Sequence, residues 1–221
     1  MKEKNANENR KQTAANALLL TTPGCVHCAA LKKILDKLLD EDVLARLDVI
    51  DVSQQPEYAE KYHVKSAPWL KLGNFQFQGK LSEKELRDWV GALNSPQGHA
   101  EYLKYVLSNG QLDLVIRMMR NGEQQLPTLL SLIKDTELDY KVRLGISAVF
   151  EELEGTNILK SVVDPLGELI RHDSPQVRAD TAHFLALTHS YNAIPYLQKL
   201  AMDENSEVRE IADDALGSPT V

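Results

Sequence analysis

The sequence is poor in cysteine and in long apolar runs. Its only two cysteines are Cys25 and Cys28, which excludes the disulfide-rich scaffold of a small secreted domain. Its longest purely apolar runs fall far short of the roughly 20 residues that a membrane-spanning helix needs, so we expect no membrane contact. The start of the sequence does not fit the pattern of a secretory signal peptide, because the first 12 residues are polar and the apolar stretch at 17–20 is too short. We therefore expect a cytoplasmic protein.

An excess of positive charge is lacking as well. The formal net charge is -7, which argues against a nucleic-acid partner. With 43% hydrophobic and 26% charged residues, the composition is that of a globular protein, and 221 residues are enough for two domains.

The charge is divided unevenly along the chain. Residues 1–98 have a net charge of +1, whereas residues 99–221 have a net charge of -8. The polar run at 95–98 lies at this shift and contains proline and glycine. We therefore predict a flexible tail at 1–13, one domain at 14–95, a linker at 96–98 and a second domain at 99–221.

The first domain shows an alternating α/β pattern. A short apolar run at 17–21 predicts a strand, and apolar residues spaced at three and four between 31 and 39 predict a helix. A second strand follows at 47–52, then a short helix at 56–62. Residues 69–72 and 75–78 flank a Gly-Asn turn, which predicts a hairpin, and a capping box at Ser82 and Glu85 begins a closing helix.

Both cysteines lie where the first strand gives way to the first helix, in the motif Cys25-Val26-His27-Cys28. The first turn of a helix has unpaired N–H groups and the positive end of the helix dipole, so a Cys25 thiolate is stabilised there. Cys28 lies one turn further on the same face, where its sulfur can resolve a mixed disulfide formed at Cys25. A partly charged His27 imidazole favours the reduced, ionised form.

Two other interpretations of the pair are open. A CxxC pair can be half of a zinc site, although a structural zinc normally has four protein ligands and the remaining histidines show no paired spacing. The pair can also be two small buried residues without a chemical role.

Two segments resemble the signature regions of the thioredoxin superfamily. They are residues 18–28, which end in the CxxC motif, and residues 62–68, which end in Pro68. The resemblance implies a thioredoxin-like fold of glutaredoxin size with no cofactor. It makes Cys25 the nucleophile, Cys28 the resolving thiol and Pro68 a cis-proline, with the Ala67 backbone presented to an extended client.

The sequence also departs from that family. Gly24 replaces the tryptophan that thioredoxins carry before the first cysteine, and Leu19 replaces their buried aspartate. The residues after the hairpin do not match the glutathione-binding pattern of glutaredoxins. Trp69 stands where the family often has threonine, and it can either contact a client at the site or pack in the core.

The second domain contains a repeated pattern. Three prolines, Pro127, Pro165 and Pro195, are each followed eight residues later by aspartate and then by a Val-Arg pair. A period in the thirties predicts pairs of helices stacked into a solenoid, and the pattern resembles HEAT repeats. A further helical hairpin is expected at 99–121, with Gly110 and Gly122 at its helix ends.

The sequence as a whole favours an α/β thioredoxin-like fold followed by an all-α HEAT-like solenoid. Our leading hypothesis is a thiol–disulfide oxidoreductase whose helical arm docks a protein client or an electron-donor protein. The alternatives are a non-catalytic chaperone or assembly adaptor that uses the first domain as a scaffold, and a dimer bridged by zinc through the two cysteines.

Overall fold

The computed structural model describes residues 15–122 and 125–217, which divide after Gly98 into two compact units. The first unit is a mixed α/β fold and the second is all-helical, as the sequence predicts. The tail expected at 1–13 lies outside the described residues.

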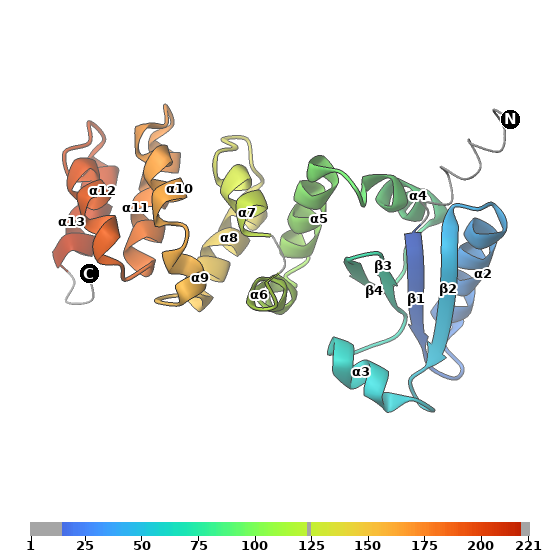
Figure 1. The fold of residues 1–221 in the computed structure, drawn as a ribbon. Helices are drawn as coiled ribbons and strands as arrows, with labels where there is room; N and C mark the ends of the chain where they lie inside the picture. Colours follow the sequence, from blue (N-terminus) through green and yellow to red (C-terminus); the bar gives the residue numbers. More distant parts are fainter. Residues whose placement is uncertain (1–14, 123–124, 218–221) are drawn as a thin grey trace, which may run out of the picture. The chain divides into compact units, whose positions relative to one another are not determined.

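The first unit is built on a four-stranded mixed sheet (Figure 1). Strand β1 pairs in parallel with β2 and antiparallel with β3, and β3 forms a hairpin with β4, which gives the order β2-β1-β3-β4. The elements follow in the order β1 (Ala15–Thr21), α2 (Val26–Asp40), β2 (Leu44–Asp51), α3 (Pro56–Tyr62), β3 (Trp69–Leu72), β4 (Phe75–Gln78) and α4 (Glu83–Ala92).

Buried side chains lie on both faces of the sheet of this unit. Leu19, Leu70 and Phe77 are paired across β1, β3 and β4, and each is at most 1% exposed. The Trp89 ring of α4 lies 5.4 Å from the Phe77 ring on this face. On the opposite face, the Tyr62 ring of α3 stacks on Trp69 of β3 at 4.8 Å.

The capping box predicted for the closing helix is present. The Ser82 hydroxyl accepts a hydrogen bond from the Glu85 N–H, and the Glu85 carboxylate accepts one from the Ser82 N–H. The Lys37 ammonium of α2 lies 2.9 Å from the Glu83 carboxylate at the start of α4. This ion pair, together with that between Arg87 and Glu41, links α2 to α4.

The linker expected at 96–98 is instead the first turn of a helix, α5 (Pro96–Ser108). The Ser95 hydroxyl accepts a hydrogen bond from the Gly98 N–H, and Pro96 is the first residue of the helix. Ser95 and Pro96 therefore favour the start of a helix here. Gly98 is needed for space, because a Cβ there would overlap the backbone carbonyl of Ala92 at the end of α4.

We therefore expect Gly98→Ala to destabilise the first unit by about 1–3 kcal/mol, the usual range for overpacking. The change should appear in urea unfolding followed by tryptophan fluorescence, because both tryptophans, Trp69 and Trp89, lie in this unit. Gly91→Ala is the matched control, since a Cβ there meets nothing within 4 Å and alanine is the better helix former. Equal stability of the two variants would contradict this role of Gly98.

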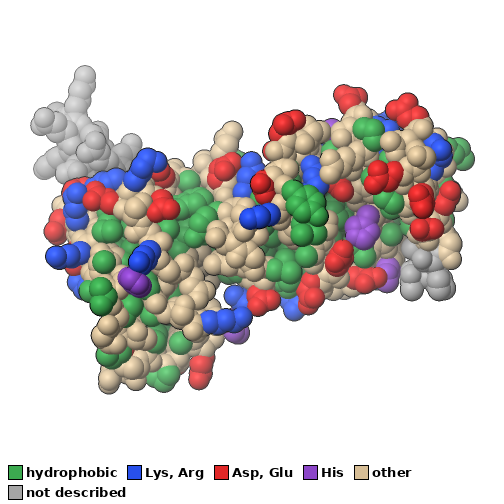
Figure 2. All heavy atoms as spheres, turned by 180° about the vertical axis from the view of Figure 1, so that it is seen from behind, with side chains coloured by type: hydrophobic (Ala, Val, Ile, Leu, Met, Phe, Trp, Pro, Cys, Tyr) green, Lys and Arg blue, Asp and Glu red, His purple; other side chains and the backbone are tan. Residues whose placement is uncertain are grey.

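The second unit is a succession of short helices. After α5 come α6 (Leu112–Arg120), α7 (Leu126–Ile133), α8 (Tyr140–Glu152), α9 (Asn157–Lys160), α10 (Val163–Gly167), η1 (Glu168–Arg171), α11 (Pro175–Leu187), η2 (Tyr191–Ala193), α12 (Ile194–Leu200) and α13 (Ser206–Gly217). Acidic side chains gather over this unit in Figure 2, in keeping with its excess of negative charge. No described helix in either unit is both long enough and apolar enough to span a bilayer.

The repeated sequence pattern corresponds to repeated contacts. Each Val-Arg pair lies near the start of α8, α11 or α13, and its arginine donates to backbone carbonyls of the turn before its own helix. Arg143 also pairs with Asp180 of α11, and Arg178 pairs with Asp203 in the turn before α13. The pattern therefore ties successive helix pairs together, while its assignment to HEAT repeats stays a prediction.

Candidate active site

The two cysteines follow a tight turn at the end of β1. The Cys25 N–H donates to the Thr22 carbonyl at 3.3 Å, which closes the turn. Gly24 has a φ of +73°, a left-handed conformation that glycine adopts without strain, and a Cβ there would meet nothing within 4 Å. The position therefore favours glycine for its backbone conformation.

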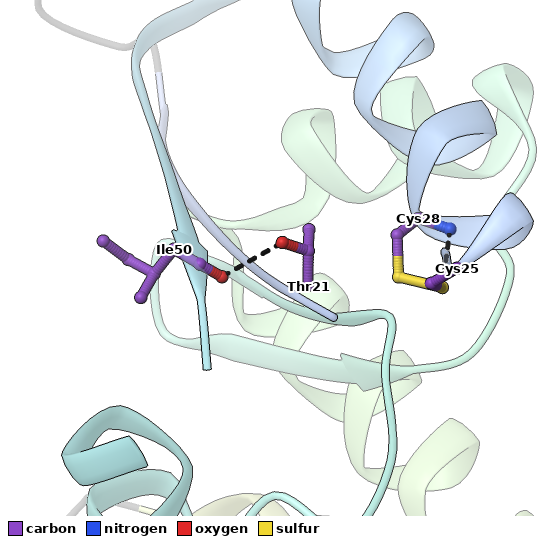
Figure 3. The surroundings of a disulfide bond; sticks show 4 residues. All are labelled: Thr21, Cys25, Cys28 and Ile50. Atoms are coloured by element: carbon purple, nitrogen blue, oxygen red, sulfur yellow. Dashed lines mark hydrogen bonds between the residues drawn. A yellow bond between two sulfur atoms is a disulfide. The ribbon is translucent and has the colours of Figure 1, made fainter. Parts of the chain in front are cut away.

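Cys25 and Cys28 form a disulfide in the structure, with their Cα atoms 5.2 Å apart (Figure 3). The two sulfurs differ in their access to solvent, because Cys28 is only 3% exposed whereas Cys25 is partly exposed. An incoming sulfur can therefore reach Cys25 more readily than Cys28.

Cys25 is also the N-terminal cap of α2. Its sulfur accepts a hydrogen bond from the Cys28 N–H at 3.1 Å, and the first turn of the 15-residue helix contains no acidic residue. One N–H that the helix leaves unpaired therefore points at the sulfur, together with the positive end of the helix dipole. This arrangement stabilises a thiolate on Cys25 once the disulfide is reduced.

The surroundings of the inner sulfur are mostly apolar. Leu19, at the position where thioredoxins carry their aspartate, is completely buried. A shallow cavity of about 440 Å³ lies beside the disulfide, and among the described residues that line it Lys32 is the only charged one. Carboxylates are therefore absent from the described lining of this cavity.

The predicted proline segment lies at the same end of the sheet. The Ala67–Pro68 peptide bond is cis, as the resemblance implied. Trp69, the next residue, pairs with Leu20 of β1, one residue before that strand ends at Thr21. Ala67 is partly exposed, whereas Trp69 is 5% exposed and its ring stacks on that of Tyr62.

His27 lies in the first turn of α2 and is exposed. Within the described residues, no three His, Cys, Asp or Glu side chains come together as a cluster that could hold a metal ion.

Sequence reasoning missed one part of the site. Val49 of β2 lines the cavity beside both cysteines, although it is 24 residues from Cys25 in the chain. It is paired in parallel with Leu19 of β1, so its place depends on the strand register. From the local sequence alone, an apolar residue in a strand that lies at the site cannot be distinguished from one that lies in the core.

The comparison with protein families gave one match. The family model described as "Thioredoxin domain" matches residues 17–91, which extend from β1 into α4 and include both cysteines and the cis-proline. No curated protein matches the chain.

Proposed function

Because residues 17–91 form a thioredoxin domain, we propose that the protein is a thiol–disulfide oxidoreductase that acts on protein disulfides through Cys25 and Cys28. The observation that carries this proposal is the double role of the Cys25 sulfur. It is joined to Cys28 in a disulfide, and it accepts the N–H bond that begins α2.

The reduced protein transfers two electrons in two exchange steps. The Cys25 thiolate attacks one sulfur of a client disulfide, a bond forms between Cys25 and that sulfur, and the other client sulfur leaves as a thiolate that takes a proton. Cys28 then loses its proton and attacks the Cys25 sulfur. The client leaves as a dithiol, and the protein is left with the Cys25–Cys28 disulfide of the structure.

Other residues of the site have supporting roles in this proposal. Pro68 and Ala67 lie at the same sheet end as Cys25, where the Ala67 backbone can pair with an extended client segment. The exposed His27 adds positive charge near the thiolate when it is protonated, which stabilises the reduced form.

The direct test of the proposal is the reactivity of Cys25 against pH. In the Cys28→Ser variant, Cys25 is the only cysteine, so alkylation by iodoacetamide reports on it alone. We expect its rate to follow a pKa below the ordinary value of about 8.5, because the helix N-terminus stabilises the thiolate. Titration at or above 8.5 would contradict the proposed activation.

We propose further that the helical unit docks the protein client or the electron-donor protein. Repeated helix pairs offer an extended surface, and the Arg178–Asp203 pair ties two of them together. The pattern of the three Val-Arg helices supports HEAT-like repeats as the form of this arm.

One observation favours a second candidate, a non-catalytic adaptor. The buried Leu19 removes the carboxylate that would accept a proton from the inner thiol, which is compatible with a domain kept as a scaffold. Reduction of insulin with dithiothreitol as the electron source separates the two functions. Wild-type protein faster than the double variant Cys25→Ser, Cys28→Ser supports the oxidoreductase, and equal rates support the adaptor.

A further inference from the structure

The cavity beside the disulfide has a mostly apolar lining, to which three aliphatic side chains contribute. Its walls come from the end of β1, the first two turns of α2 and the edge strand β2. The side chains that decide its character are Val26, Ala29 and Val49, and Val26 and Val49 are exposed by 77% and 37%. Large apolar side chains that stay this exposed next to a reactive sulfur mark a surface suited to contact.

Two of the polar side chains that line the cavity have partners within the protein, and the exposed Thr22 adds a further hydroxyl to the lining. The Thr21 hydroxyl donates to the Ile50 carbonyl at 3.2 Å, as Figure 3 shows. The Lys32 ammonium lies 2.7 Å and 2.9 Å from the two carboxylate oxygens of Asp36, one turn along α2. A ligand in the cavity therefore meets the aliphatic surface of Val26, Ala29 and Val49, together with the Thr22 hydroxyl.

We propose that this cavity is a specificity subsite that takes an aliphatic side chain next to the client's reactive cysteine. The inference rests on the proposed function, because that function brings a client sulfur into bonding distance of Cys25, which itself lines the cavity. Successive Cα atoms are about 3.8 Å apart, so the residues next to the client cysteine are close enough to the cavity for one of their side chains to enter it.

The charged residues of the cavity lining also affect which client side chain it accepts. Lys32 is the only charged side chain among the described lining residues, and its partner Asp36 is not part of the lining, so a lysine or arginine next to the client cysteine finds no carboxylate in the lining. The subsite therefore favours leucine, isoleucine or valine over serine and over basic residues.

The test is a competition for Cys25 in the Cys28→Ser variant. The protein is first converted to the mixed disulfide with thionitrobenzoate. Two peptide thiols are then added in equal amounts, one with Leu-Cys-Leu and one with Ser-Cys-Ser at the centre. A peptide thiolate attacks the Cys25 sulfur, a new disulfide forms, and thionitrobenzoate leaves as a thiolate. Intact mass at equilibrium gives the ratio of the two adducts.

We expect the leucine adduct to exceed the serine adduct about fivefold, as partial burial of one leucine side chain would give. Val49→Asp should bring the ratio close to one. The matched control is Ala45→Asp, which adds the same charge to an exposed position of the same strand outside the cavity lining and should keep the wild-type ratio. If Val49→Asp does not fold by circular dichroism, the nearly isosteric Val49→Thr should still lower the ratio.

The outcomes separate the subsite from the function on which it rests. Adducts of both peptides in equal amounts would overturn the subsite and leave the redox chemistry of Cys25 supported. A Val49 variant that keeps the fivefold preference would also overturn it. Failure of Cys25 to form either adduct would overturn the proposed function itself.

Discussion

Replacing Cys28 by serine should turn the protein into a trap for its clients. Cys25 keeps its hydrogen bond from the backbone N–H of residue 28, so the first attack proceeds, but no second sulfur is present to release the client. We expect turnover with insulin to fall to the uncatalysed background while covalent adducts accumulate. Nonreducing electrophoresis and mass spectrometry of the adducts give the measurement.

Cys25→Ser is the matched control for this experiment. It removes the exposed sulfur and leaves Cys28, which is only 3% exposed. Turnover should again fall to background, but without the accumulation of adducts. Equal trapping by both single variants would show that the two sulfurs are interchangeable, contrary to the order of attack proposed above.

The second large effect is expected in the helical unit, at Arg178. This side chain is 6% exposed and donates to both carboxylate oxygens of Asp203, at 2.7 Å and 2.9 Å. It also donates to the carbonyls of His172 and Asp173. Arg178→Ala leaves a nearly buried carboxylate and two carbonyls without this partner, so we expect a loss of about 3 kcal/mol in the free energy of unfolding.

Urea unfolding can assign this loss to the correct unit. Far-ultraviolet circular dichroism reports mainly on the helical unit, whereas tryptophan fluorescence reports on the first unit, which holds Trp69 and Trp89. Arg178→Ala should shift the first signal and leave the second in place. Arg209→Ala is the control, since Arg209 donates to the Asp203 and Glu204 carbonyls and should cost only about 1 kcal/mol. Equal losses at Arg178 and Arg209 would contradict the account.

The same ion pair gives a pH dependence. The Arg178 guanidinium beside Asp203 holds the pKa of that carboxyl below its ordinary value of 3.8. A lowered folded-state pKa means that the stabilisation is fully present above the ordinary value and is lost as the pH falls through the folded-state value. The stability advantage of the wild type over Asp203→Asn should therefore be constant near neutral pH and shrink below about pH 4. A stability advantage of the wild type over Asp203→Asn that stays the same down to pH 2 would contradict this pH dependence.

Sequence reasoning succeeded where the signal is local. The hairpin follows from its Gly-Asn turn and alternating Phe and Gln residues, and the start of α4 follows from the capping box at Ser82. The CxxC motif at the front of α2 is equally local. In each case the residues that determine the conformation are within a few positions of one another.

It failed where distant parts of the chain decide the outcome. The sequence places Gly98 in a linker, but the close approach of Ala92 explains its identity. Val49 joins the site only through the register of β2 against β1. The proline pattern gave the helix pairs correctly, but it did not show that Arg178 reaches an aspartate 25 residues further along the chain.

The central claim is that Cys25 and Cys28 form one redox couple. Equilibration of the protein in glutathione buffers of graded potential, followed by acid quenching and mass analysis, measures it directly. We predict a single two-electron transition between the dithiol and the Cys25–Cys28 disulfide. Two cysteines that stay reduced across the whole range, or that are glutathionylated independently without forming the internal bond, would contradict the claim.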